Sequence, residues 1–210
     1  MNEQILIKTL PSGKLSADHY ERVASPMPEI QAGEVLVKTN AFAITAGTRA
    51  GLQGSASYAG APTTGIVMGG TGVGTIVATN SDAVQVGDQV LTSTGWQQYS
   101  VQKPANLELI PARHDPLHYL GPMGVNGLTA YFGLLSVGEA RAEQTVMVSA
   151  AAGSVGHLVG QMAKIQGCSV VGVAGSDQKN DTLVSKLGVD AAVNYKNGDY
   201  RAALKEATPD

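Results

Sequence analysis

Hydrophobic and polar positions follow different patterns in the two halves of this 210-residue chain. In the first half, short β-rich runs are separated by glycine-containing turns, which predicts strands rather than helices. The predicted strands are 4–10, 34–39, 74–78, 89–91 and 97–101. Short strands at this spacing indicate a partly closed β-barrel.

From residue 125 onward, short apolar runs alternate with segments of helical length. A predicted helix at 127–135 comes first, and three apolar strands follow at 145–149, 169–173 and 191–194. Each of these strands is followed by a predicted helix. The alternation indicates βαβ units in a parallel sheet, which right-handed crossovers build into a doubly wound layer.

The boundary between the two patterns falls in the stretch 111–120, which contains two prolines. We therefore predict an α/β protein with a β-rich domain at 1–118 and a parallel-sheet domain at 119–210. The net charge of −3 offers no basic field for nucleic acid or an anionic membrane. No apolar run is long enough to span a bilayer and the N-terminus lacks a secretory pattern, so we expect a cytoplasmic protein.

Metal chemistry has little support in the sequence. Cys168 is the only cysteine, which excludes a Cys-rich zinc site. The one cluster of potential ligands is His114, Asp115 and His118, and a solvated loop before the following helix explains it better. We therefore predict no metal site.

The first apolar strand of the second half is followed by the segment AAAGSVG, residues 150–156. Set against the fingerprint G-x-G-x-x-G, it carries Ala151 at the first glycine and keeps Gly153 and Gly156. Free N–H groups and the helix dipole at such a turn attract phosphate, so we predict a dinucleotide site. The predicted contacts are Ala152, Gly153, Ser154, Val155 and Gly156. The alternative is a small-residue turn that only packs the helix against the sheet.

The end of the second strand indicates which dinucleotide binds. An NAD site usually has Asp or Glu there to hold the ribose hydroxyls, but this strand ends in Val173-Ala174-Gly175. Asp177 comes slightly later and Lys179 follows. A cation at this place can pair with the extra phosphate of NADP, so NADP(H) is the predicted cofactor. The alternative is that Lys179 is a solvated lysine in the first helical turn.

Several longer stretches of the chain resemble a known family. They are PEIQAGEVLVK (28–38), VGDQVL (86–91), GVNGLTAYFGLL (124–135), TVMVSAAAGSVGHLVGQMAK (145–164), GCSVVGVAGSDQK (167–179) and LGVDAAVNYK (187–196). The chain is similar to zinc-independent medium-chain dehydrogenases/reductases, in the branch of prostaglandin reductases and NADPH-dependent curcumin reductases. The resemblance implies a GroES-like catalytic barrel joined to a Rossmann domain, with the cofactor between them.

Four side chains are carried over from this resemblance. Lys179 and Tyr195 are expected at the adenosine phosphate, and Thr129 on the nicotinamide side. The alternatives are an ordinary strand-end tyrosine and a helical threonine that bonds to its own backbone. Tyr58 resembles a tyrosine of the family's substrate pocket and is the candidate catalytic residue, with a loop tyrosine that only packs as the alternative.

The implied reaction is hydride transfer from NADPH to the β-carbon of an α,β-unsaturated ketone or aldehyde. A hydroxyl group of a tyrosine or of the cofactor ribose would suffice to stabilise the charge that develops on the carbonyl oxygen, so no metal is required. The open alternatives are a quinone reductase of the same superfamily and a nucleotide-binding or redox-sensing module without catalysis. At 44–49 the family often has an Asp-Pro-Tyr-Met-Arg run, of which only Arg49 is present, so the substrate preference is not carried over.

Length is the larger departure from the family. The chain supplies one βαβαβα half of a fold that needs two. We expect a truncated product, or a chain that pairs with a second copy as a homodimer, with little reductase activity by itself. The strand 191–194 is expected to lack its cover and to expose apolar surface.

Overall fold

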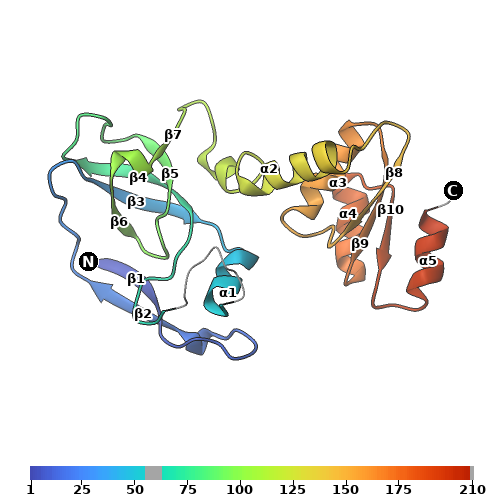
Figure 1. Ribbon diagram of the computed structural model, residues 1–210, viewed down its shortest axis with the longest axis horizontal. Coiled ribbons are helices and arrows are strands. Elements are labelled where there is room, and N and C mark those ends of the chain that lie inside the picture. The colour runs from blue at the N-terminus through green and yellow to red at the C-terminus, as the bar shows by residue number, and fades with distance from the viewer. Residues whose placement is uncertain (55–62, 209–210) are drawn as a thin grey trace. The chain divides into compact units, whose positions relative to one another are not determined.

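The computed structural model describes residues 1–54 and 63–208 and divides the chain into two compact units, Met1–Leu120 and Gly121–Asp210 (Figure 1). The strands of the first unit pair antiparallel, whereas those of the second unit pair parallel and alternate with helices. The predicted α/β class, with a β-rich first part and a partial doubly wound second part, is confirmed.

The first unit contains a five-stranded antiparallel sheet with the strand order β6-β3-β4-β5-β7. The strands are β3 (Val35–Phe42), β4 (Gly72–Thr79), β5 (Gln89–Thr92), β6 (Tyr99–Gln102) and β7 (Glu108–Ile110). Alternate side chains of a strand point to opposite faces, so one face can bury a row of β-branched residues. Val35, Val37, Ile76 and Val90 form this fully buried row.

A two-stranded hairpin, β1 (Asn2–Ile7) and β2 (Tyr20–Ser25), belongs to the same unit. The buried side-chain amide of Asn2 donates to the Tyr99 carbonyl oxygen at 2.9 Å and accepts from the Tyr99 N–H at 2.9 Å. These two bonds connect β1 to the start of β6. Strand β2 was not predicted, because its sequence, YERVAS, lacks an apolar run, and none of its residues is fully buried.

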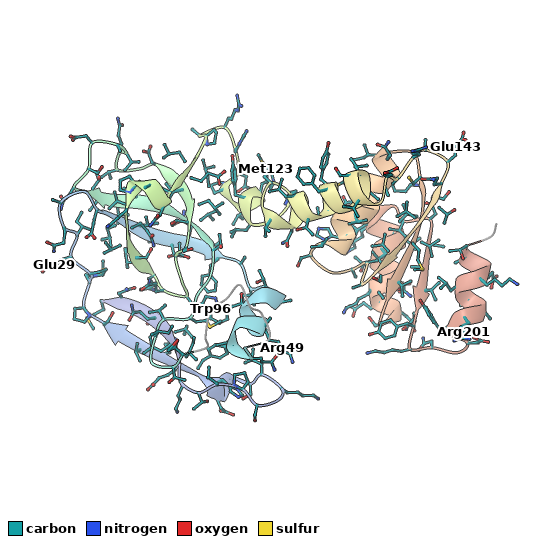
Figure 2. All side chains as sticks on the ribbon, viewed as in Figure 1. Glu29, Arg49, Trp96, Met123, Glu143 and Arg201 are labelled. Atoms are coloured by element: carbon teal, nitrogen blue, oxygen red, sulfur yellow. The ribbon has the colours of Figure 1, made fainter. Side chains whose placement is uncertain are left out.

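A small aromatic cluster packs beneath the first short helix of this unit, α1 (Ala46–Leu52). The Trp96 ring, labelled in Figure 2, stacks between Tyr20 and Phe42 with ring centroids 5.4 and 5.3 Å away. Leu52 of α1 joins the same cluster. The glycines at 47, 51 and 54 are unfavourable in a helix, so the sequence does not predict α1. In the structure the Thr45 hydroxyl accepts from the Thr48 N–H and caps the start of this helix. The described residues of this unit also include the 3-10 turns η1 (Ala17–His19), η3 (Pro104–Asn106) and η4 (Pro116–Leu120).

The second unit is a three-stranded parallel sheet with the order β10-β9-β8 (Figure 1). Its strands are β8 (Thr145–Ser149), β9 (Ser169–Ala174) and β10 (Ala191–Asn194). Its helices are α2 (Val125–Tyr131), which continues as the π-helical η5 (Phe132–Val137), α3 (Gly156–Ile165), α4 (Asp177–Leu187) and α5 (Tyr200–Ala207). Every strand–helix alternation expected from the sequence is therefore present.

The apolar core of this unit lies between the sheet and the helices α3 and α4. Val170 and Leu183 are fully buried in it, and Val148 and Ala163 pack beside them. Helices α3 and α4 contact each other and both contact β9. No helix in the described part of the chain is long and apolar enough to cross a membrane.

One expectation about the sheet edges is wrong. β10 does not lack cover: α4 and α5 both contact it, and Val193 is only 6% exposed. The chain's own last helix supplies the cover that was expected to be missing. At the other edge of the sheet, on β8, Met147 is 49% exposed.

Candidate dinucleotide site

The turn that follows β8 is held by its own backbone. Ala150 adopts a φ of 48°, in the left-handed region, so the chain reverses immediately after Ser149. The Gly153 N–H donates to the Ala150 carbonyl oxygen at 2.8 Å, and the Ala151 N–H donates to the Val173 carbonyl oxygen at 3.0 Å. The second bond ties the turn to β9.

Close backbone approach requires glycine at position 156 and leaves little room for a Cβ at position 153. A Cβ atom at Gly156 would lie 2.5 Å from the Ala150 carbonyl oxygen and 2.8 Å from the Ala151 Cα, which no side chain can relieve because both are backbone atoms. A Cβ at Gly153 would lie 3.1 Å from the Ala150 oxygen. Gly160, one turn further along α3, has only ordinary contacts, the nearest at 3.5 Å. The helix therefore begins closely packed against the turn.

The start of α3 carries unpaired backbone donors. Among the described residues, the N–H groups of Ala152, Ser154, Val155 and Gly156 donate no hydrogen bond to another protein group. No side chain caps this helix, and Ala152 and Ser154 are exposed. Unpaired N–H groups and the positive end of the helix dipole together favour an anion at this place. The Gly153 N–H is already bonded, so Gly153 contributes space rather than a donor.

The carboxyl end of β9 lies at the same edge of the sheet, because Ser149 of β8 pairs with Val173 of β9. Tyr195 follows β10, and its N–H donates to the Ala174 carbonyl oxygen at 3.1 Å. Its ring lies against Gly175, where an added Cβ would be 2.9 Å from the Tyr195 hydroxyl oxygen. The turn, the end of β9 and Tyr195 are thus brought together at one sheet edge.

Lys179 lies in the first turn of α4, just beyond this edge. The Ser176 hydroxyl caps the helix by accepting from the Lys179 N–H at 3.4 Å. The Lys179 side chain is exposed and forms no ion pair within the described part of the chain. Its ammonium group is therefore available to a phosphate.

The acidic residue nearest to the end of β9 is already engaged. Asp177 accepts from the Asn194 amide at 2.7 Å and from the Asn197 amide at 2.9 and 3.0 Å. Sequence reasoning missed both asparagines, because their spacing from Asp177 has meaning only once β10 lies beside β9. A carboxylate held by two amides has fewer free lone pairs for the ribose hydroxyls that an NAD site would offer it.

Two of the predicted site residues lie elsewhere or outside the described residues. The Thr129 hydroxyl donates to the Val125 carbonyl oxygen at 2.6 Å, which is the local bond named above as the alternative to a nicotinamide-side role. Its nicotinamide-side role stays a prediction. Tyr58 falls outside the described residues, and its catalytic role also stays a prediction. In the described ranges, no group of three or more His, Cys, Asp or Glu side chains is arranged to hold a metal.

Two known protein families match the chain, one in its first part and one in its second part. Residues 3–110 match the family described as the N-terminal domain of oxidoreductase. Residues 154–210 match the family described as zinc-binding dehydrogenase. The second match begins within the glycine turn.

Individual relatives extend the likeness over nearly the whole chain. YfmJ of Bacillus subtilis (strain 168), provisionally described as an NADP-dependent oxidoreductase, is 40% identical over 99% of this chain, which covers 62% of YfmJ. The NADPH-dependent curcumin reductase of Escherichia coli (strain K12) is 32% identical over 99% of this chain, which covers 61% of it. The crystal structure of CurA from Vibrio vulnificus in complex with NADPH superimposes with a TM-score of 0.91 at 32% identity, over 97% of this chain and 61% of CurA.

An antiparallel β unit followed by a parallel β–α unit with a glycine-containing turn after its first strand is the architecture of dinucleotide-dependent oxidoreductases. The chain belongs to the medium-chain dehydrogenase/reductase superfamily, in its prostaglandin reductase and curcumin reductase branch. It spans somewhat less than two thirds of the length of these relatives.

Proposed function

We propose that this chain binds NADP(H) and is part of a metal-independent reductase of the activated C=C bond of α,β-unsaturated ketones and aldehydes. The observation that carries the proposal is the turn after β8, which presents four unpaired N–H groups at the start of an uncapped helix. Relatives named 2-alkenal reductase (NADP(+)-dependent), prostaglandin reductase 1 and NADPH-dependent curcumin reductase support the reaction class.

The geometry of the second unit fits this cofactor. The diphosphate would be held by the N–H groups of Ala152, Ser154, Val155 and Gly156. Because Gly156 has no Cβ, the start of α3 can lie close to the turn that carries these groups. At the other end, Lys179 would pair with the ribose phosphate and the Tyr195 ring would lie beside it. These assignments together explain why the site would prefer NADPH to NADH.

When bound, NADPH supplies the hydride for the reduction. The protein must then provide a hydrogen-bond donor for the carbonyl oxygen of the substrate and exclude water. We assign these tasks to the domain at 1–118, with Tyr58 as the proposed donor. Thr129, in the second domain, is the proposed neighbour of the nicotinamide. Neither assignment requires a metal.

Cofactor choice is tested on the 210-residue chain by titration with NADPH and with NADH, followed by cofactor fluorescence. We expect NADPH to bind about tenfold more tightly or better, since one charge-assisted contact distinguishes the two. Equal affinities would contradict the assignment of Lys179 and Tyr195. Binding of neither cofactor would contradict the proposed function itself.

The reaction is tested on a chimera in which this chain replaces the matching part of YfmJ, so that its residues act within a protein of the relatives' length. NADPH consumption is then measured with a panel of enones, quinones and simple alcohols. We expect enones to be consumed fastest. Consumption of quinones alone would favour the quinone reductase, and tight NADPH binding without turnover of any compound would favour a non-catalytic nucleotide-binding module.

A further inference from the structure

A histidine in the first turn of α3 makes two hydrogen bonds to one oxygen of the dinucleotide turn. The backbone N–H of His157 donates to the Gly153 carbonyl oxygen at 3.1 Å, and the ring Nδ1 lies 2.8 Å from the same oxygen. A carbonyl oxygen can only accept, so the ring nitrogen that faces it must carry the proton. The Gly153 carbonyl oxygen therefore accepts two hydrogen bonds from the same residue, one from its backbone and one from its ring.

This carbonyl belongs to the same peptide unit as the N–H of Ser154. The chain has no cis peptide bonds among its described residues, and in a planar trans peptide the C=O and N–H point in opposite directions. Fixing the Gly153 carbonyl toward the first turn of α3 therefore also fixes the direction of the Ser154 N–H, away from the helix. That N–H is one of the unpaired donors described above.

The turn has few other restraints at this peptide. Gly153 lacks a side chain, Val155 gives the helix no side-chain cap, and Ser154 is exposed. In the part of the chain that the structure describes, the His157 ring is the one side chain that hydrogen-bonds to the segment 150–155. Without it, the Gly153–Ser154 peptide would keep only the backbone bond from the His157 N–H to the Gly153 carbonyl oxygen.

We propose that His157 is a positioning residue of the dinucleotide site. Its imidazole holds the Gly153–Ser154 peptide so that the Ser154 N–H faces the pyrophosphate of the bound cofactor. The inference rests on the proposed function, because it assumes that this turn receives the diphosphate. It assigns His157 no contact with the cofactor and no proton transfer.

The test compares His157→Ala with His157→Ser. A serine in a helix can donate its hydroxyl proton to the carbonyl four residues earlier, so it can rebuild the bond to Gly153, whereas alanine cannot. We expect His157→Ala to weaken NADPH binding about three- to tenfold, the range of one net hydrogen bond, and His157→Ser to stay within about twofold of the wild type. Adenosine 2′-monophosphate, which lacks the pyrophosphate, should bind all three proteins equally.

A second measurement follows the mobility of the Gly153–Ser154 peptide in the absence of cofactor. The backbone order parameter of the Ser154 amide, from nitrogen-15 relaxation, should fall in His157→Ala and recover in His157→Ser. Unchanged Ser154 order together with unchanged NADPH affinity in His157→Ala would overturn the inference, as would a parallel loss of adenosine 2′-monophosphate binding. If the wild-type chain binds no NADPH but Ser154 order still depends on His157, the proposed function fails while the positioning effect stands.

Discussion

The two units differ in what their candidate sites are made of. In the second unit the turn that we propose to accept phosphate offers backbone N–H groups, and it needs glycine where a Cβ atom would not fit, so its requirements appear in the sequence as glycines at fixed spacing. In the first unit the segment 44–49, where the chain departs from the family, is distinguished by its side chains, such as Ile44, which is 73% exposed. A backbone site can therefore be recognised from one sequence, whereas a site made of variable side chains cannot.

The largest effect should come from filling the space at the turn. Gly156→Ala places a Cβ 2.5 Å from the Ala150 carbonyl oxygen, so the turn or the helix start must move and the N–H groups lose their common direction. We expect NADPH affinity to fall about 100-fold or more, which corresponds to about 2.7 kcal/mol. The matched control is Gly160→Ala on the same helix, which has room and should bind normally.

Both proteins should first be shown to be folded by circular dichroism and thermal unfolding. A folded Gly156→Ala protein with wild-type affinity would mean that the turn only packs the helix against the sheet, and would break the contrast between a backbone site and a side-chain site.

The next effect concerns the charged side chain that we place at the ribose phosphate. Lys179→Glu exchanges an attraction for a repulsion, so NADPH binding should weaken about tenfold or more while NADH binding changes little. Lys186→Glu, an exposed lysine in the last turn of the same helix, is the charge-matched control. If both substitutions reduce NADPH binding equally, the cause is net charge and not a specific contact.

A smaller effect is expected at Tyr195. Tyr195→Phe keeps the ring against Gly175 but removes the hydroxyl group, so it separates packing from hydrogen bonding. If the hydroxyl contacts the ribose phosphate, NADPH should bind about two- to tenfold more weakly, with NADH unaffected. An unchanged NADPH to NADH ratio would leave Tyr195 as an ordinary strand-end tyrosine.

The smallest effect tests a residue of the second unit that lies away from the turn. The Lys164 ammonium, which donates to Asp190 at 2.7 Å, and the Val170 N–H, which donates at 2.6 Å, hold the pKa of the Asp190 carboxyl below its usual value. Asp190→Asn should lower the free energy of unfolding by about 1 kcal/mol, a small value because the side chain is half exposed, without changing NADPH binding.

The pH dependence of this effect has a definite sign. A carboxyl with a lowered folded-state pKa stabilises the fold above its unfolded-state pKa, and that contribution is lost as the pH falls through the lowered value. Urea unfolding of the wild type and of Asp190→Asn should therefore differ at neutral pH and converge in acid. A constant difference across this range would contradict the role of the Asp190 charge.

Much of the fold could be predicted because apolar periodicity directly reports burial. Val170, Val171 and Val173 of β9 form a continuous apolar run that is buried on both faces. The helix α1 could not be predicted, because its glycines oppose a helix and its formation depends on the Thr45 cap and on packing of Leu52.

Part of the candidate site could likewise be predicted from the sequence and part could not. The glycines of the turn could be recognised because their spacing is a physical requirement. His157 and the two asparagines at Asp177 could not, because a hydrogen bond across a turn or between strands depends on tertiary contact. The cover over β10 was misjudged because the position of α5 is not visible in local sequence.

Titration of the chain with NADPH, followed residue by residue through its backbone amide signals in nuclear magnetic resonance, tests the central claim most directly. We predict that the amides of Ser154, Val155 and Gly156 shift most and saturate together with those near Lys179 and Tyr195. Shifts confined to another surface, with the amides of the turn unmoved at saturation, would show that the turn does not receive the diphosphate.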